Sequence, residues 1–146
     1  MKQKLYSYIL AFLQYSLMSL LLYLNVNQLK DEVSCVIFFI GLVIGIYAIF
    51  NNGLNNFRII SEIKNGATLI THGLYSYIRH PMYFSVIVMS FALIIKKINF
   101  TNLLLFGLIV VILFLKAKRE EKIWSEKTPS YKEYIKNTKM MIPFLL

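Results

Sequence analysis

The chain has 146 residues, of which 58% are apolar, and its mean hydropathy is +0.60. This length suits at most one domain, and the composition is too apolar for an ordinary soluble protein. Sixteen Lys and Arg residues against seven Asp and Glu give a net charge of +9. In so apolar a chain we attribute this charge to membrane topology and contact with anionic lipid headgroups, and we do not expect nucleic-acid binding.

Four apolar segments predict transmembrane helices at about 5–26, 33–50, 82–95 and 100–115. Roughly 20 helical residues cross a hydrocarbon layer of ~30 Å, so the first two segments are long enough and the last two are short. Only the four residues of Lys96–Asn99 join the last two segments, which makes them antiparallel neighbours. We therefore predict an all-α integral membrane protein with about four transmembrane helices, as a single domain over residues 1–146.

Two further helices are expected outside the membrane. A short interfacial helix is predicted at about 54–63, where Ile residues alternate with charges, before the turn signal Asn65-Gly66. An amphipathic helix is predicted at about 130–140, after the helix-breaking Pro129. The chain therefore returns to the membrane surface at its C-terminal end.

Small residues and the single cysteine carry structural expectations. Gly41 and Gly45 form a small-xxx-small pair, for which we expect close helix packing and regard dimerisation as the weaker alternative. The oligomeric state is not predicted. Cys35 is the only cysteine and lies in an apolar segment, so we expect neither a disulfide nor a metal site.

The positive charges predict the orientation. If the N-terminus is cytoplasmic, only Lys30, Lys96 and Lys97 lie on the other side, and the remaining thirteen of the 16 Lys and Arg residues are cytoplasmic. This asymmetry agrees with the positive-inside rule. We therefore expect both termini on the cytoplasmic side of a multi-pass protein.

Two polar clusters lie at the cytoplasmic ends of the last two apolar segments, over residues 73–83 and 116–121. Polar groups at the edge of lipid are costly without a partner or a function, and the hairpin brings the two clusters together. Pro81 suits the first turn of a helix, with His80 at the N-cap, and such a terminus favours a carboxylate. Glu120 and Glu121 are suited to an ammonium or a sulfonium. The combination is complementary to a zwitterionic amino-acid head, as in S-adenosylmethionine.

The run from Leu69 to Tyr83, with Arg79-His80-Pro81, followed by Arg119-Glu120-Glu121, Tyr131-x-x-Tyr134 and Ile142-Pro143, resembles the isoprenylcysteine carboxyl methyltransferase family. The related phospholipid methyltransferases share this plan. The resemblance runs from about Ala67 to Pro143 and implies an S-adenosylmethionine-dependent methyltransferase whose cofactor region is about 67–143. It also implies a hydrophobic or lipid-linked acceptor, with either an isoprenylcysteine-type carboxylate or a lipid headgroup.

The resemblance further implies the site residues. The catalytic residues would be Lys116, Arg119 and Glu120, with Lys116 at the position of a family arginine that receives the substrate carboxylate. A lysine offers a point charge in place of a bidentate fork. Trp124 is interpreted as an interfacial anchor. The cofactor contacts would be Ala67, Thr68, Leu69, Ile70, Tyr75, His80, Pro81, Met82, Tyr83 and Glu120.

Two other interpretations stay open. Membrane sterol reductases carry a similar Arg-His-Pro-x-Tyr motif and bind NADPH, but they are generally much longer, and this chain has no evident second phosphate-binding patch. A small membrane protein without enzymatic activity that kept the scaffold is the other alternative.

Overall fold

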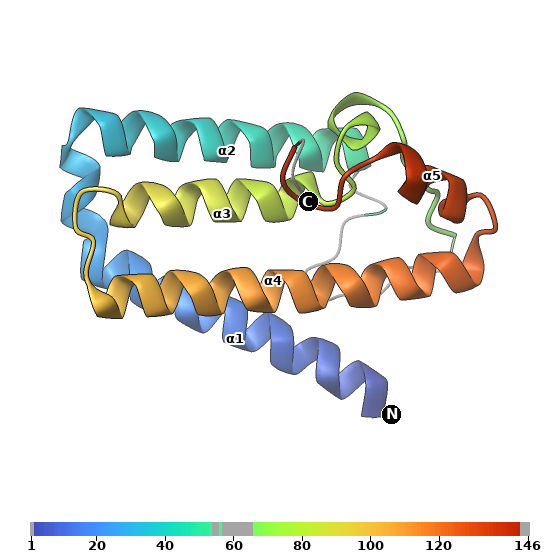
Figure 1. Ribbon diagram of the computed structural model, residues 1–146, viewed down its shortest axis with the longest axis horizontal. Coiled ribbons are helices and arrows are strands. Elements are labelled where there is room, and N and C mark those ends of the chain that lie inside the picture. Colours follow the sequence, from blue (N-terminus) through green and yellow to red (C-terminus); the bar gives the residue numbers. More distant parts are fainter. Residues whose placement is uncertain (1, 54–55, 57–65, 144–146) are drawn as a thin grey trace.

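The computed structural model describes residues 2–53, 56 and 66–143 (Figure 1). Four long helices run side by side in alternating directions, and a short fifth helix lies at one end of this bundle. Short 3-10 turns at Val26–Lys30 and Gly73–Ser76 precede the second and third helices. The described residues include no strand beyond an isolated bridge, so the predicted all-α class is confirmed. The helices are α1 (Lys2–Asn25), α2 (Glu32–Asn52), α3 (Pro81–Ile94), α4 (Phe100–Lys127) and α5 (Tyr131–Asn137).

Among the described residues, three helices are long and apolar enough to cross a membrane: α1 with its following turn, α2 and α4. The apolar α3 has 14 residues and is therefore about 21 Å long, short of the ~30 Å hydrocarbon layer. Helix α4 continues well past the predicted apolar segment and carries the second polar cluster on its last three turns. The predicted interfacial helix at 54–63 lies outside the described residues, apart from Asn56.

The helix ends follow from local sequence. Asp31 caps α2 by accepting a hydrogen bond from the backbone N–H of Ser34 at 3.0 Å. Asn99 caps α4 in the same way, accepting from the N–H of Asn102 at 2.9 Å. Pro81 occupies the first turn of α3, where its missing N–H leaves no bond unmade. These caps fix where each helix starts and so where the hairpin ends lie.

Helices α2 and α3 approach each other closely at the two glycines. A Cβ added to Gly41 would lie 2.7 Å from Met89 Cγ and 3.0 Å from its backbone nitrogen, and one added to Gly45 would lie 2.8 Å from Ser85 Oγ. At Gly41 the clash includes the backbone of α3, so a larger residue there would have to displace that helix. The small-residue pair is thus used for packing within the chain.

Helix α1 is joined to α4 by three hydrogen-bonded pairs of polar side chains. Each pair takes one buried residue from α1, and the pairs are spaced along the antiparallel contact. They are Ser7–Arg119 (2.6 Å), Gln14–Lys116 (2.6 Å) and Asn25–Asn102 (3.0 Å).

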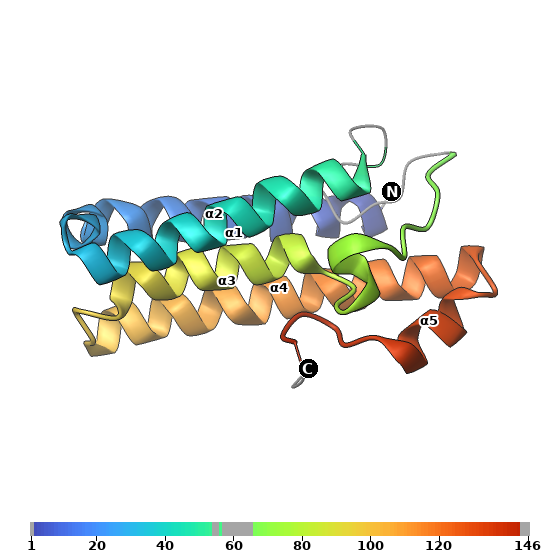
Figure 2. The same cartoon turned by 90° about the horizontal axis from the view of Figure 1, so that it is seen from above.

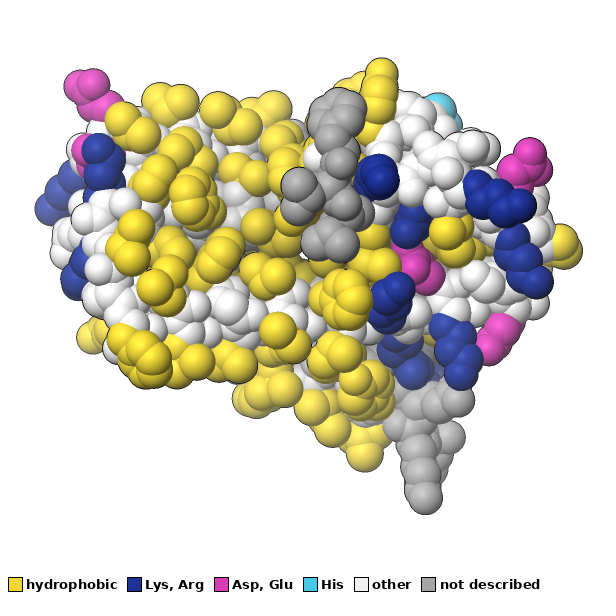
Figure 3. Space-filling model, viewed as in Figure 1, with side chains coloured by type: hydrophobic (Ala, Val, Ile, Leu, Met, Phe, Trp, Pro, Cys, Tyr) yellow, Lys and Arg dark blue, Asp and Glu magenta, His cyan; other side chains and the backbone are white. Residues whose placement is uncertain are grey.

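Several polar segments of the chain lie together at one end of the bundle. The start of α1, the segment before α3 and helix α5 all lie at this end (Figure 2). Many Lys and Arg side chains lie there, a smaller charged group lies at the opposite end, and hydrophobic side chains cover much of the visible surface between the two ends (Figure 3). The C-terminal tail pairs with the segment before α3: Lys139 N–H donates to Tyr77 O at 3.0 Å and His80 N–H donates to Met140 O at 2.9 Å.

Candidate functional site

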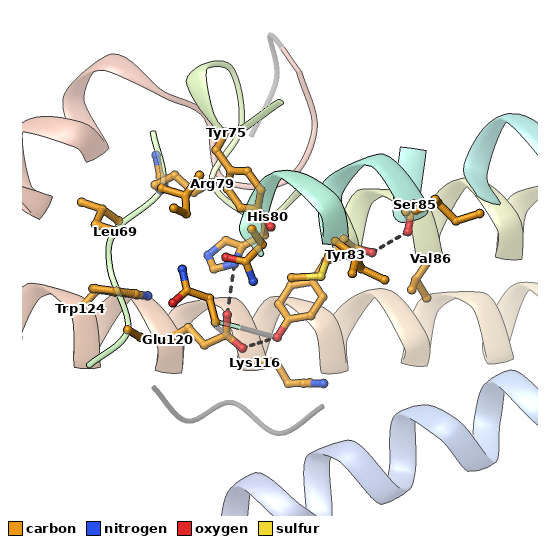
Figure 4. A pocket seen from close by; sticks show the side chains of 18 of the residues that line it. Leu69, Tyr75, Arg79, His80, Tyr83, Ser85, Val86, Lys116, Glu120 and Trp124 are labelled. Carbon is orange, nitrogen blue, oxygen red and sulfur yellow. Dashed lines mark hydrogen bonds and ion pairs between the residues drawn. The ribbon is translucent and has the colours of Figure 1, made fainter. Parts of the chain in front are cut away.

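A cavity of about 330 Å³ opens at the polar end, between the start of α3, the inner face of α4 and residues 67–70. Helices α1, α2 and α5 contribute further walls (Figure 4). This volume lies within the roughly 300–1,000 Å³ of typical small-molecule pockets. Most of the lining is apolar, and a few polar side chains converge at one side.

His80, Tyr83 and Glu120 form the polar centre of this cavity and point toward one another in Figure 4. The Tyr83 hydroxyl donates a hydrogen bond to Glu120 Oε1. His80 Nδ1 lies 3.4 Å from Glu120 Oε2, and its ring stacks on that of Tyr83 with centroids 5.3 Å apart. The start of α3 supplies His80 and Tyr83, and α4 supplies Glu120, so the two predicted clusters do meet in one site.

The charge of His80 follows from its surroundings. Burial lowers the pKa of this imidazole, but the Glu120 and Glu121 carboxylates raise it, and the resulting pKa lies above the usual value for histidine. Its Nε2 is 3.7 Å from Glu121 Oε1 and, among the described residues, is buried without a hydrogen-bond partner. The imidazole therefore lies between the Glu120 and Glu121 carboxylates, which favour its protonated form.

Lys116 lies one helical turn before Glu120 and also lines the cavity. Its side chain is only 2% exposed. The ammonium donates to Gln14 Oε1 at 2.6 Å and lies 5.2 Å from the centre of the Tyr83 ring. A neutral amide and an aromatic face are therefore among the contacts of this cation with the described residues.

Arg79 forms hydrogen bonds with the C-terminal segment beside the cavity. Its Nε donates to Glu121 Oε1 at 2.6 Å, and another guanidinium nitrogen donates to the backbone oxygens of Ile135 and Thr138. The Tyr134 hydroxyl donates to Tyr75 O at 2.5 Å. Burial raises the pKa of Tyr134 to about 12, so this hydroxyl keeps its proton across the neutral range.

Most of the residues implied by the sequence resemblance come together. Pro81 is buried at the start of α3 but does not line the cavity. Arg119 is also not among the lining residues, since its Nε donates to Ser7 Oγ at 2.6 Å and its guanidinium lies over the Tyr6 ring. Those that do line it are Ala67, Thr68, Leu69, Ile70, Tyr75, His80, Met82, Tyr83, Lys116 and Glu120.

Several residues of the cavity wall were not among the predicted site residues, and Trp124 and Gln14 are two of them. Trp124 lines the cavity and stacks on Tyr131 with ring centroids 6.1 Å apart, although it was interpreted as a membrane anchor. The signal for it was present, because Lys116, Glu120 and Trp124 follow the i, i+4 spacing of one helix face. Gln14 was also missed, and its signal was a polar side chain in the middle of an apolar segment.

The donor and acceptor groups fit a zwitterionic ligand with an aromatic or cationic part. Glu120 offers a carboxylate to a cation, and His80 with the start of α3 offers positive charge to an anion. The rings of Tyr75, Trp124 and Tyr134 offer faces to a cation or a flat base.

Comparison with protein families gives one match. The model of the isoprenylcysteine carboxyl methyltransferase family matches residues 33–126, which is more than half of the chain. The matched range contains α2, the segment before α3, α3 itself and nearly all of α4, and it leaves out α1 and α5. No curated protein matches the chain.

Proposed function

Because this chain belongs to the isoprenylcysteine carboxyl methyltransferase family of membrane proteins, we propose that it transfers a methyl group from S-adenosylmethionine to an acid-bearing amphiphile. The family gives the reaction class. The methyl donor and the acceptor chemistry are the parts that we propose.

The observation that carries the proposal is the pairing of Glu120 with His80 and Tyr83 across the two hairpin ends. Glu120 would bind the ammonium of the donor's amino-acid head. His80 and the start of α3 would bind the carboxylate of that head. The rings of Trp124 and Tyr134 would pack against the base. When bound, S-adenosylmethionine supplies a methyl group on a sulfonium, with a neutral thioether as the leaving group.

The other part of the cavity suits an apolar acceptor tail. Its wall continues from Lys116 along the apolar residues Ile46 of α2 and Val86 and Met89 of α3. Ile46 is 47% exposed, and we infer that this wall opens toward the side of the bundle that would face lipid. A hydrophobic acceptor can therefore enter sideways, while a water-soluble donor enters from the polar end.

Lys116 favours an acid over an amine as the reacting head. A buried ammonium attracts a carboxylate and repels an alkylammonium. A carboxylate acceptor also needs no general base, since it reacts in its ionised form. The chain's contribution would then be to position the two reactants and to exclude water.

Calorimetric titration of the detergent-solubilised protein tests the donor. We expect S-adenosylmethionine to bind and NADPH not to bind. Glu120→Gln should weaken S-adenosylmethionine binding by about 10- to 150-fold, because it removes a charge-assisted interaction worth about 1.5–3 kcal/mol.

The matched control is Glu126→Gln, since Glu126 is exposed on the same helix and does not line the cavity. Equal affinity of the folded Glu120→Gln protein would remove this carboxylate from the donor site. Binding of NADPH in place of S-adenosylmethionine would instead support the reductase alternative.

A further inference from the structure

Helix α1 reaches the cavity although it lies outside the segment matched by the family model. Gln14, in the middle of α1, is 4% exposed and lines the cavity beside Lys116. Of the three polar pairs between α1 and α4, this is the only one whose two members both line the cavity. The other two pairs join the helices without touching it.

In this pair, Gln14 can fix the position of the Lys116 ammonium without neutralising its charge. A lysine side chain is long and flexible, and its ammonium has three N–H donors. Gln14 Oε1 accepts one of them at 2.6 Å, and because an amide is neutral, this contact fixes the cation without cancelling its charge. A carboxylate at position 14 would fix the ammonium equally well but would neutralise it.

The direction of the cation also follows from its neighbours. The Tyr83 ring lies 5.2 Å from Lys116 Nζ, and the hydroxyl of the same tyrosine donates to Glu120. Gln14 contacts the ammonium from α1, while α3 and α4 supply the tyrosine and the glutamate. The ammonium is thus located between the polar centre and the apolar wall of the cavity.

We propose that Gln14 is a positioning residue, which holds the charged Lys116 ammonium at the cavity wall so that Lys116 binds the anionic head of an amphiphilic acceptor. The proposal deepens the function proposed above and rests on it for the methyl transfer. The binding step is separate from methyl transfer and can be measured without a methyl donor.

The test uses an N-acylated S-farnesylcysteine, as the free acid and as its primary amide, titrated into the detergent-solubilised full chain without S-adenosylmethionine. Trp124 is the only tryptophan of the chain and lines the cavity, so its fluorescence reports binding there. The wild type should bind the acid about tenfold or more tightly than the amide, as expected for one charge-assisted hydrogen bond.

In Gln14→Leu, the ratio of the affinities for the acid and for the amide should fall close to one. The reason is that the Lys116 ammonium loses its hydrogen bond to the Gln14 amide oxygen. Gln14→Glu should also lose the preference, because the new carboxylate neutralises Lys116. A residue that only holds the fold together would behave differently, since Gln14→Glu keeps the size and the acceptor oxygen of the original side chain.

The matched control is Asn25→Leu, which breaks another buried amide pair between α1 and α4 at the far end of the bundle. This variant should keep the acid preference even if it melts at a lower temperature. If Gln14→Leu fails to fold, Gln14→Glu decides the matter.

An acid preference that persists in either Gln14 variant overturns the proposal, and so does a wild type that binds acid and amide equally. The methyltransferase assignment survives both of these results, because the titration with S-adenosylmethionine tests it independently. Failure of the wild type to bind S-adenosylmethionine, with the acid preference intact, would reject the proposed function and leave the role of Gln14 in anion binding.

Discussion

At the scale of single residues, His80 is the group whose charge depends most on its neighbours. It is buried and lies between two carboxylates that α4 supplies, those of Glu120 and Glu121. The pKa of His80 is raised despite its burial, so the folded protein binds this proton more tightly than the unfolded chain does.

This raised pKa predicts a loss of stability with rising pH. The contribution of His80 is fully present below its unfolded pKa of about 6.5 and disappears as pH rises through the higher folded pKa. Melting temperatures in detergent should therefore fall across that range in the wild type, and His80→Gln should reduce the fall. His72 is the only other histidine and is exposed, so His72→Gln should retain the wild-type slope. An unchanged slope in His80→Gln would show that the imidazole is not the titrating group.

The residues of the polar centre could be predicted because they lie in two short motifs at the ends of one apolar hairpin. The direction of the Arg119 side chain could not be predicted from the sequence. This residue lies three residues after Lys116 and one before Glu120, so its direction depends on how α4 is rotated against its neighbours. Helix α1 decides this by binding Arg119 through Ser7, and no local pattern in α4 reveals that contact.

At the scale of elements, the contact between α2 and α3 depends on glycine. The space that a Gly41 side chain would need is occupied by Met89, including its backbone, and by Ser85 O at 3.1 Å. A backbone cannot rotate away as the end of a flexible side chain can. Helix α3 would have to move, and it carries His80 and Tyr83 at its start.

Gly41→Ala should therefore destabilise the protein by about 1–3 kcal/mol, the usual range for overpacking a tight contact. Gly107→Ala on α4 is the matched control, because an added Cβ there meets nothing within 4 Å. This control should be neutral or slightly stabilising, since alanine favours helix over glycine. Thermal unfolding in detergent measures both variants, and equal melting temperatures would contradict the close approach.

The elements themselves were largely predictable from hydrophobic length and from the polar breaks between segments. The end of the C-terminal helix could not be predicted from the local sequence. A helix was expected over about 130–140, but α5 stops at Asn137. Thr138 is extended instead, and Lys139 forms a β-bridge with Ile78, because the backbone groups of Lys139 and Met140 bond to the segment before α3. A local pattern does not reveal such a distant partner.

At the scale of the whole molecule, the alternating helices place the start of α1 and the end of α4 at the same end of the bundle, beside the cavity (Figure 1). From the positive-inside rule we expect this end to face the cytoplasm, where the proposed methyl donor would be supplied. Lys96 and Lys97 lie at the opposite end, in the connection between α3 and α4.

Cysteine labelling tests this orientation. Single cysteines at Lys127 and Lys97, both exposed, are introduced into a Cys35→Ala background. We expect a membrane-impermeant thiol reagent to label Lys97→Cys in intact cells and Lys127→Cys only after permeabilisation. The reverse pattern would place the cavity on the far side of the membrane.

The contacts made by Arg79 join parts of the chain that are synthesised at different times. All four long helices precede α5 in the chain, so their residues are synthesised before Tyr131 and Tyr134. Arg79 and His80 receive their tail partners only afterwards. A copy cut before α5 would thus keep the four long helices, but its cavity would lack the wall formed by Tyr131 and Tyr134. The helical bundle and the complete cavity therefore depend on different parts of the chain.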